Sequence, residues 1–109
     1  SGVDAELHMS TLPLLDGAVD CVKAGIVSSL QPANVRLRRA LRNADEFVND
    51  PRYPLLFDPQ TAGGLLASVP AAQAPDCVQA LQAAGYVHTA VIGRVTAQGE
   101  TLEPVVLKT

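Results

Sequence analysis

The amino-acid sequence predicts a small α+β domain of mixed α/β character, with about four strands in one sheet and two main helices on one face of it. Its 109 residues are enough for one domain and too few for two. Apolar residues make up 48% of the chain and charged residues 17%, a balance typical of a folded core. The apolar pattern switches along the chain between the period of a strand and the period of a helix. The predicted order is strand, helix, an irregular or short helical region, strand, helix, strand and strand.

The first strand and the first helix follow each other directly. Apolar and polar residues alternate over 3–9, as in a half-buried strand. Ser10 and Pro13 are signals of a helix start, and apolar residues then recur at helical spacing until Gly25. We therefore expect a helix over 13–24, because glycine often stands just past a helix end.

The middle of the chain is less regular. Pro32 breaks the stretch 26–34, which predicts a loop. Asn43 is a candidate helix cap followed three residues later by a glutamate, so we expect helix over 44–49. Residues 35–41 fit either a helix continuous with that segment or an extended arm, and the sequence leaves both open.

The second half predicts three strands and one helix. A short apolar strand is expected over 65–69, and a helix over 72–84 before a glycine. Strands are expected over 89–95 and 102–107, paired as a hairpin through the turn at 98–99. The helix over 72–84 has an apolar face that should be buried, formed by Ala74, Cys77, Val78 and Leu81.

Composition excludes several classes of protein. The net charge of −3 and the pI near 5.1 argue against a nucleic-acid-binding protein, which is usually basic. No apolar run reaches the ~20 residues of a membrane helix, so no membrane partner is expected. Cys21 and Cys77 lie far apart and show no metal-ligand spacing, which predicts free thiols in a reducing cytoplasm. No nucleophile and base can be paired, so we predict neither a catalytic residue nor a metal ligand in this chain.

Four of the eight basic residues lie within seven positions, as Arg36, Arg38, Arg39 and Arg42. Guanidinium groups suit phosphates through paired hydrogen bonds. The simpler interpretation is a solvated surface with salt bridges to Asp45, Glu46 and Asp50.

One stretch carries unusual chemistry, and it consists of Asp58, Pro59, Gln60, Thr61, Ala62, Gly63 and Gly64. Consecutive glycines let the backbone come close to a ligand, and successive N–H groups in such a turn can form an anion-binding concavity. The alternative is a tight turn that needs positive φ at one of the two glycines.

The segment FDPQTAGGLLASVP (57–70) resembles a signature of the selenophosphate synthetase family, also called selenide, water dikinases. The strand AVIGRV (90–95) and the segment LPLLDGA (12–18) resemble that family too, and Asn34 stands where the family has a loop ending in asparagine. The similarity extends over nearly the whole chain. One departure is Ala62, where serine is common in the family.

The resemblance implies that residues 3–109 are an incomplete C-terminal domain, like that of aminoimidazole ribonucleotide synthetases, without its upstream strands. Ser1-Gly2 is then interpreted as a cloning remnant. The full-length enzyme would convert ATP, selenide and water into selenophosphate, AMP and phosphate with Mg²⁺. It would be a cytoplasmic homodimer whose N-terminal domain binds ATP.

The resemblance also implies roles for individual residues. The family's reactive cysteine and its neighbouring lysine match nothing here, so the chain alone is predicted to be inactive, with no tightly bound cofactor. Its contribution would be to shape the ATP and phosphate cleft, through Asp58, Gln60, Thr61, Gly63, Gly64 and Asn34. Two alternatives remain: a non-catalytic module that binds itself or another protein, and the C-terminal domain of another ATP-dependent member of the superfamily.

Overall fold

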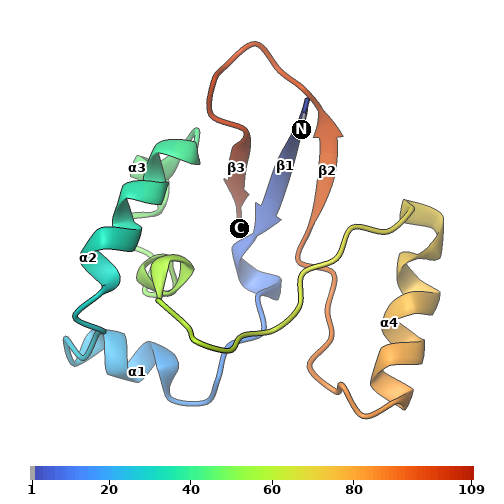
Figure 1. The fold of residues 1–109 in the computed structure, drawn as a ribbon, viewed down its shortest axis with the longest axis horizontal. Coiled ribbons are helices and arrows are strands. Elements are labelled where there is room, and N and C mark those ends of the chain that lie inside the picture. The colour runs from blue at the N-terminus through green and yellow to red at the C-terminus, as the bar shows by residue number, and fades with distance from the viewer. Residues whose placement is uncertain (1) are drawn as a thin grey trace.

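The computed structural model describes residues 2–109 and shows an α+β fold, as predicted (Figure 1). The strands are β1 (Val3–His8), β2 (Gly93–Ala97) and β3 (Val105–Lys108). The α-helices are α1 (Ala18–Lys23), α2 (Gln31–Asn34), α3 (Ala44–Phe47) and α4 (Ala74–Ala83). Four 3₁₀ helices complete the fold: η1 (Met9–Thr11), η2 (Val35–Ala40), η3 (Tyr53–Phe57) and η4 (Ala71–Gln73).

The sheet has three strands in the order β2-β1-β3. β1 pairs antiparallel with β2 and parallel with β3. The predicted hairpin of the last two strands is therefore wrong, because β1 from the start of the chain lies between them. A parallel neighbour needs a long connection, and nearly the whole chain provides it here.

The fourth predicted strand, over 65–69, does not form. This stretch belongs to no helix or strand, and every one of its residues is exposed. Leu65 is 104% exposed and Leu66 is 81% exposed. An apolar segment becomes a strand only when a neighbouring strand accepts its backbone hydrogen bonds, and residues 2–109 place none beside it.

The helices of the first half are shorter than predicted. The helix expected over 13–24 is reduced to α1, because Gly17 before it has a φ of +81° and cannot lie inside a right-handed helix. The predicted loop 26–34 contains α2, which tolerates Pro32 in its first turn. Residues 35–41, which the sequence left open, mostly form η2.

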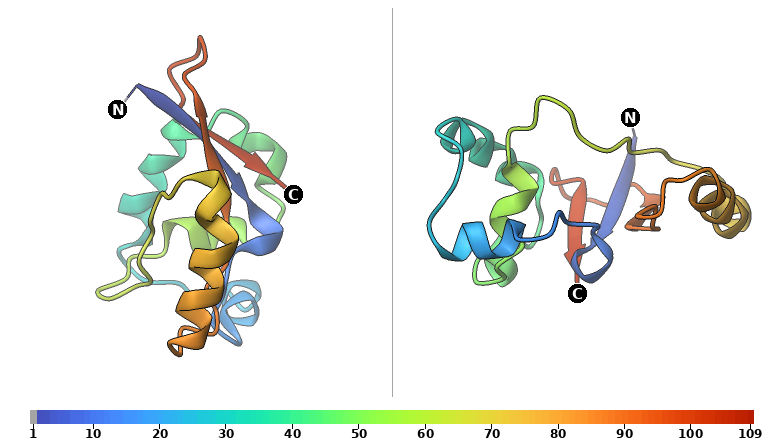
Figure 2. Two further views of the ribbon diagram at one scale, coloured as in Figure 1. Left: turned by 90° about the vertical axis from the view of Figure 1, so that its right-hand side faces the viewer. Right: turned by 90° about the horizontal axis from the view of Figure 1, so that it is seen from below.

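We had expected the two main helices to lie on one face of the sheet, and this prediction is wrong. α1 packs against η3 on the side of β3, whereas α4 lies beyond β2 (Figures 1 and 2). No residue of α4 is buried. The apolar face predicted for this helix is only partly covered, since Ala74, Cys77 and Val78 are half-buried and Leu81 is 39% exposed. None of the described helices is long and apolar enough to cross a membrane.

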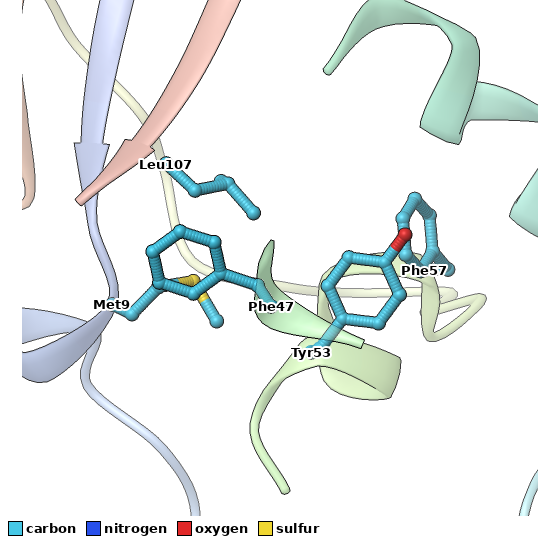
Figure 3. Close-up of a cluster of buried hydrophobic side chains, with 5 residues drawn as sticks. All are labelled: Met9, Phe47, Tyr53, Phe57 and Leu107. Atoms are coloured by element: carbon cyan, nitrogen blue, oxygen red, sulfur yellow. The ribbon is translucent and has the colours of Figure 1, made fainter. Parts of the chain in front are cut away.

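The hydrophobic core lies between β1, β3, α3 and η3, and its buried side chains are Met9, Phe47, Tyr53, Phe57 and Leu107 (Figure 3). The rings of Tyr53 and Phe57 meet edge to face, with centroids 5.2 Å apart and an interplanar angle of 73°. With so few large side chains buried, each of them matters for stability.

Asn43 fixes the outer edge of β3 instead of capping a helix. Its side chain makes no capping hydrogen bond to α3. Its Nδ2 donates to the carbonyl oxygen of Leu107 over 3.0 Å, and the N–H of Leu107 donates to its Oδ1 over 2.9 Å. Together with the bridge between Leu41 and Val105, these bonds pair the edge of β3 with residues 41–43.

Three arginines form close ion pairs with carboxylates. Arg42 reaches Asp4 at 2.6 Å, and the same carboxylate accepts the N–H of Gly99 at 3.0 Å. The other two pairs are Arg52 with Asp50 and Arg94 with Glu6, each at 2.7 Å. Within residues 2–109, Arg36, Arg38 and Arg39 have no carboxylate within 4.0 Å. All four arginines of the cluster are exposed, so the prediction of a solvated surface is confirmed. The predicted salt bridges are wrong for these three, and Arg42 pairs with none of the three predicted partners.

These pairs predict how stability depends on pH. Hydrogen bonds from the arginine partners lower the pKa of Asp4, Glu6 and Asp50. The unfolded chain therefore takes up protons at higher pH, near 4, than the folded chain does. The stabilisation is complete above that range and is lost as pH falls below it. We expect the urea midpoint to be flat above about pH 5 and to drop below about pH 4. Asp4→Asn should flatten the drop, and the exposed control Asp45→Asn should not; equal slopes for the two would contradict this.

Candidate functional site

The predicted site segment 58–64 begins at the core and leads away from it. Phe57 is buried, with 4% exposure, and ends η3. The N–H of Asp58 donates to the carbonyl oxygen of Leu55 over 3.3 Å. Asp58 is half-buried, and its carboxylate accepts no hydrogen bond within residues 2–109. The start of the segment is thus held firmly while its first polar side chain is left unpaired.

Beyond Pro59, which is half-buried, the segment is exposed and forms no closed turn. Gln60 and all residues from Thr61 to Gly64 are exposed. Among residues 2–109, positive φ is found at Gly2, Gly17, Gly25 and Gly85, which all lie outside the segment. A concavity of successive N–H groups is formed by alternating right- and left-handed residues or by a turn. Residues 58–64 contain no left-handed residue, and their binding of an anion stays a prediction. The predicted positive-φ turn at Gly63 or Gly64 is wrong.

Gly63 has a different use in this structure. A Cβ at Gly63 would come within 2.5 Å of Oε1 of Gln60. The glycine therefore leaves room for the Gln60 amide to fold back over the backbone. By contrast, nothing lies within 4 Å of a Cβ at Gly64.

Asp58 is one of the residues that line a groove of about 330 Å³, which the sequence did not predict. The groove lies between α1, η3 and the loop that joins α1 to α2, and Gln31 supports it by donating from Nε2 to the carbonyl oxygen of Pro54 over 2.8 Å. Its other lining residues are Ala18, Cys21, Val22, Ile26, Val27, Ser28 and Leu55. The helical spacing of Ala18 and Val22 was visible in the sequence, but the loop after α1 carries no pattern that predicts a wall.

Asn34 is separate from this arrangement. It is the last residue of α2 and is half-buried. It does not line the groove, and no hydrogen bond joins it to residues 58–64. The candidate residues from Asp58 to Gly64 are neighbours in the sequence, and the structure leaves Asn34 apart from them at the end of α2.

The donor set of 58–64 fits one wall of a phosphate site. Its backbone N–H groups, the Thr61 hydroxyl and the Gln60 amide can donate to phosphate oxygens. The segment contains no lysine or arginine, and residues 2–109 hold no group of three metal-ligating side chains. If a triphosphate binds here with Mg²⁺, other residues must supply the positively charged side chains and the ligands of the metal.

No family model matches this chain. Comparison with known proteins nevertheless finds relatives that are similar over most of its length. A selenide, water dikinase of Pelobacter propionicus is 48% identical over 108 residues, which are 99% of this chain and 30% of that protein. One of Trichlorobacter lovleyi is 38% identical over 92% of the chain and 28% of its own length. Selenide, water dikinase 2 of Peptoclostridium acidaminophilum is 31% identical over 92% of the chain and 28% of its own length. The similarity identifies the chain as a homologue of the selenide, water dikinases that spans about three tenths of their length.

Proposed function

We propose that this chain acts as part of the C-terminal domain of a selenide, water dikinase, and that residues 58–64 form one wall of its phosphate cleft. The observation that carries the proposal is the state of this segment. Seven mostly polar or glycine residues are anchored at Phe57, and the Asp58 carboxylate and the residues after it are left open to a ligand. The names of the relatives supply the reaction class.

In this proposal the chain positions and shields the reacting groups. The Thr61 hydroxyl and the backbone N–H groups of 60–64 donate to phosphate oxygens of ATP, and Gln60 moves off Gly63 to add its amide. Mg²⁺ held by residues outside this chain would supply positive charge to the phosphates during transfer. Closure of 58–64 over the phosphates excludes water that would otherwise hydrolyse ATP without forming selenophosphate.

The remaining parts of the enzyme follow from the same proposal. Residues 3–109 are one unit of the C-terminal domain, and Asn34 orients the loop next to the cleft. A separate N-terminal domain holds ATP, Mg²⁺ and the groups that handle selenide, and the full-length protein is a cytoplasmic homodimer. The 109-residue chain alone then forms no AMP from ATP and selenide.

The test is Asp58→Ala in a full-length chain that carries these residues. The carboxylate has no hydrogen-bond partner here, so we expect a change in Tm close to zero. Turnover should fall about tenfold or more, because one misplaced group at a phosphoryl-transfer site has an effect of that size. AMP formation with ATP and selenide measures turnover, and the 109-residue chain alone is the blank.

Asp16→Ala is the matched control, since Asp16 is exposed and lies outside every helix and strand. It should leave both Tm and turnover unchanged. Unchanged turnover in Asp58→Ala, or AMP formation by the 109-residue chain alone, would refute the proposal.

A further inference from the structure

The short helix η2 carries three arginines without a partner in the described part of the chain. Arg36, Arg38 and Arg39 are exposed. Within residues 2–109 none of them lies within 4.0 Å of a carboxylate, and none donates a side-chain hydrogen bond. The other three arginines of the chain each pair with a carboxylate. The positive charge on η2 is therefore not neutralised by the chain itself.

The 3₁₀ form of η2 determines how these charges are arranged. In a 3₁₀ helix, residues three positions apart stand directly above each other. Arg36 and Arg39 therefore share one side of η2, and Arg38 shares a side with Val35. Like charges at this spacing repel each other. An anionic ligand that lies along η2 would relieve the repulsion.

An apolar groove lies directly beside these charges. It has a volume of about 380 Å³ and is lined by Val27, Gln31, Pro32 and Val35. Val35 belongs both to the groove and to η2, so the apolar surface continues into the charged one. Leu37, between the arginines, is 57% exposed. We call the groove and the three arginines together the η2 surface.

Gln31 provides a fixed polar group in this groove. The residue is 7% exposed, and its Nε2 donates to the carbonyl oxygen of Pro54 over 2.8 Å. Its Oε1 accepts no hydrogen bond within residues 2–109 and is still accessible at the surface. An amide oxygen held in this way can accept a hydrogen bond from a ligand N–H group.

The spacing of the arginines favours an extended ligand over a small anion. Pockets for small molecules bring a few polar groups together around the ligand, and none of the three arginines lines the groove. Arg36 and Arg39 lie about 6 Å apart along the axis of η2, at ~2.0 Å per residue. In an extended peptide, every second side chain points the same way about 7 Å further on. Two acidic side chains of such a peptide therefore match the two arginines.

The composition of the chain favours an acidic peptide over a nucleic acid. The net charge of the chain is −3, whereas surfaces that bind a long polyanion are usually basic. Residues 31–42 contain no aromatic side chain on which a base could stack. An acidic peptide needs only the local charge of η2 and an apolar groove beside it.

The position of η2 favours a segment of another protein. η2 lies beyond β3, at the opposite end of the molecule from α4 (Figures 1 and 2). The edge of β3 already pairs with residues 41–43, and the open edge of the described sheet is β2. The strands that the domain lacks therefore have room beside β2 and not beside η2.

We propose that the η2 surface binds an acidic peptide segment of another protein. Carboxylates two positions apart in the segment pair with Arg36 and Arg39, and one apolar side chain fills the groove beside Val35. A backbone N–H of the segment donates to Oε1 of Gln31. This inference does not depend on the role of residues 58–64, because none of them lines this groove.

A fluorescent peptide with one leucine flanked on both sides by alternating glutamates tests the proposal, with binding measured by anisotropy. It should bind the 109-residue chain and a full-length protein that carries these residues equally well. The double variant Arg36→Glu, Arg39→Glu should bind it about tenfold more weakly or worse, because two attractions become repulsions. The matched control is Lys23→Glu with Lys108→Glu, which changes the net charge equally at two exposed lysines and should bind like the parent. Equal binding by the two double variants would overturn the proposal.

Changes in the probe test the groove and the kind of ligand on the unaltered protein. A peptide with serine in place of the leucine should bind about fivefold more weakly or worse, because the groove then buries no apolar side chain. Equal binding of the two peptides would overturn the proposal. Displacement of the peptide by inorganic phosphate, or equally tight binding of a single-stranded oligonucleotide of the same charge, would overturn it by showing a general anion surface. Binding to the 109-residue chain but not to the full-length protein would overturn it by showing that the enzyme itself covers η2.

Discussion

Gly93→Ala is expected to separate β2 from β1 and to destabilise the chain by about 3 kcal/mol or more, the cost of a severe backbone overlap. A Cβ at Gly93 would overlap the backbone carbonyl oxygen of Glu6 and would lie 3.2 Å from Cα of Leu7. Both neighbours are backbone atoms of the central strand, so neither can rotate away as a side chain would. The urea midpoint, followed by circular dichroism, measures the loss.

Gly64→Ala is the control for that measurement. Gly64 has no positive φ, and nothing lies within 4 Å of a Cβ built on it. Its stability should stay within about 0.5 kcal/mol of the parent, as for other surface changes. If Gly93→Ala and Gly64→Ala unfold at the same urea concentration, the close approach of β1 and β2 is not present in solution.

Phe57→Ala should have the second large effect, a loss of about 3–5 kcal/mol, as for other buried phenylalanines. The ring is 4% exposed, and its removal also takes away the edge-to-face contact with Tyr53. Because Phe57 fixes the start of 58–64, the variant should loosen the candidate site together with the core. Urea unfolding at constant pH measures the change.

Tyr86→Ala is the matched control, since it also deletes an aromatic ring, from a side chain that is 66% exposed. It should destabilise the chain by less than about 1 kcal/mol. A Phe57→Ala variant as stable as Tyr86→Ala would show that the core of Figure 3 is not assembled.

The sequence predicted local structure where the pattern was strong and no distant partner was needed. The alternation over 3–9 became β1, and the periodic stretch 72–84 became η4 and α4. The helix expected over 13–24 was too long because the left-handed Gly17 lies within its pattern. Periodicity shows which side chains are apolar. It does not show whether a single residue has a left-handed backbone conformation.

Long-range pairing was the part that the sequence did not predict. Two neighbouring apolar runs suggested a hairpin, yet the place between β2 and β3 is taken by β1. The run over 65–69 has strand composition but no strand partner. For the site, the polar character of 58–64 was readable, and its open conformation and the groove beside Asp58 were not. These properties depend on what packs around a segment.

The position of β1 between β2 and β3 also determines when this molecule can assemble. β1 (Val3–His8) can form its strand pairs only after β2 (Gly93–Ala97) and β3 (Val105–Lys108) have been synthesised. On the ribosome, the first six residues of the ladder remain unpaired until nearly the whole stretch has been translated. Closing so long a loop is costly in chain entropy and makes folding slow. During translation of this stretch, Val3–His8 therefore stays without its strand partners until residues 93–108 have been made, and a chaperone has that time to bind it.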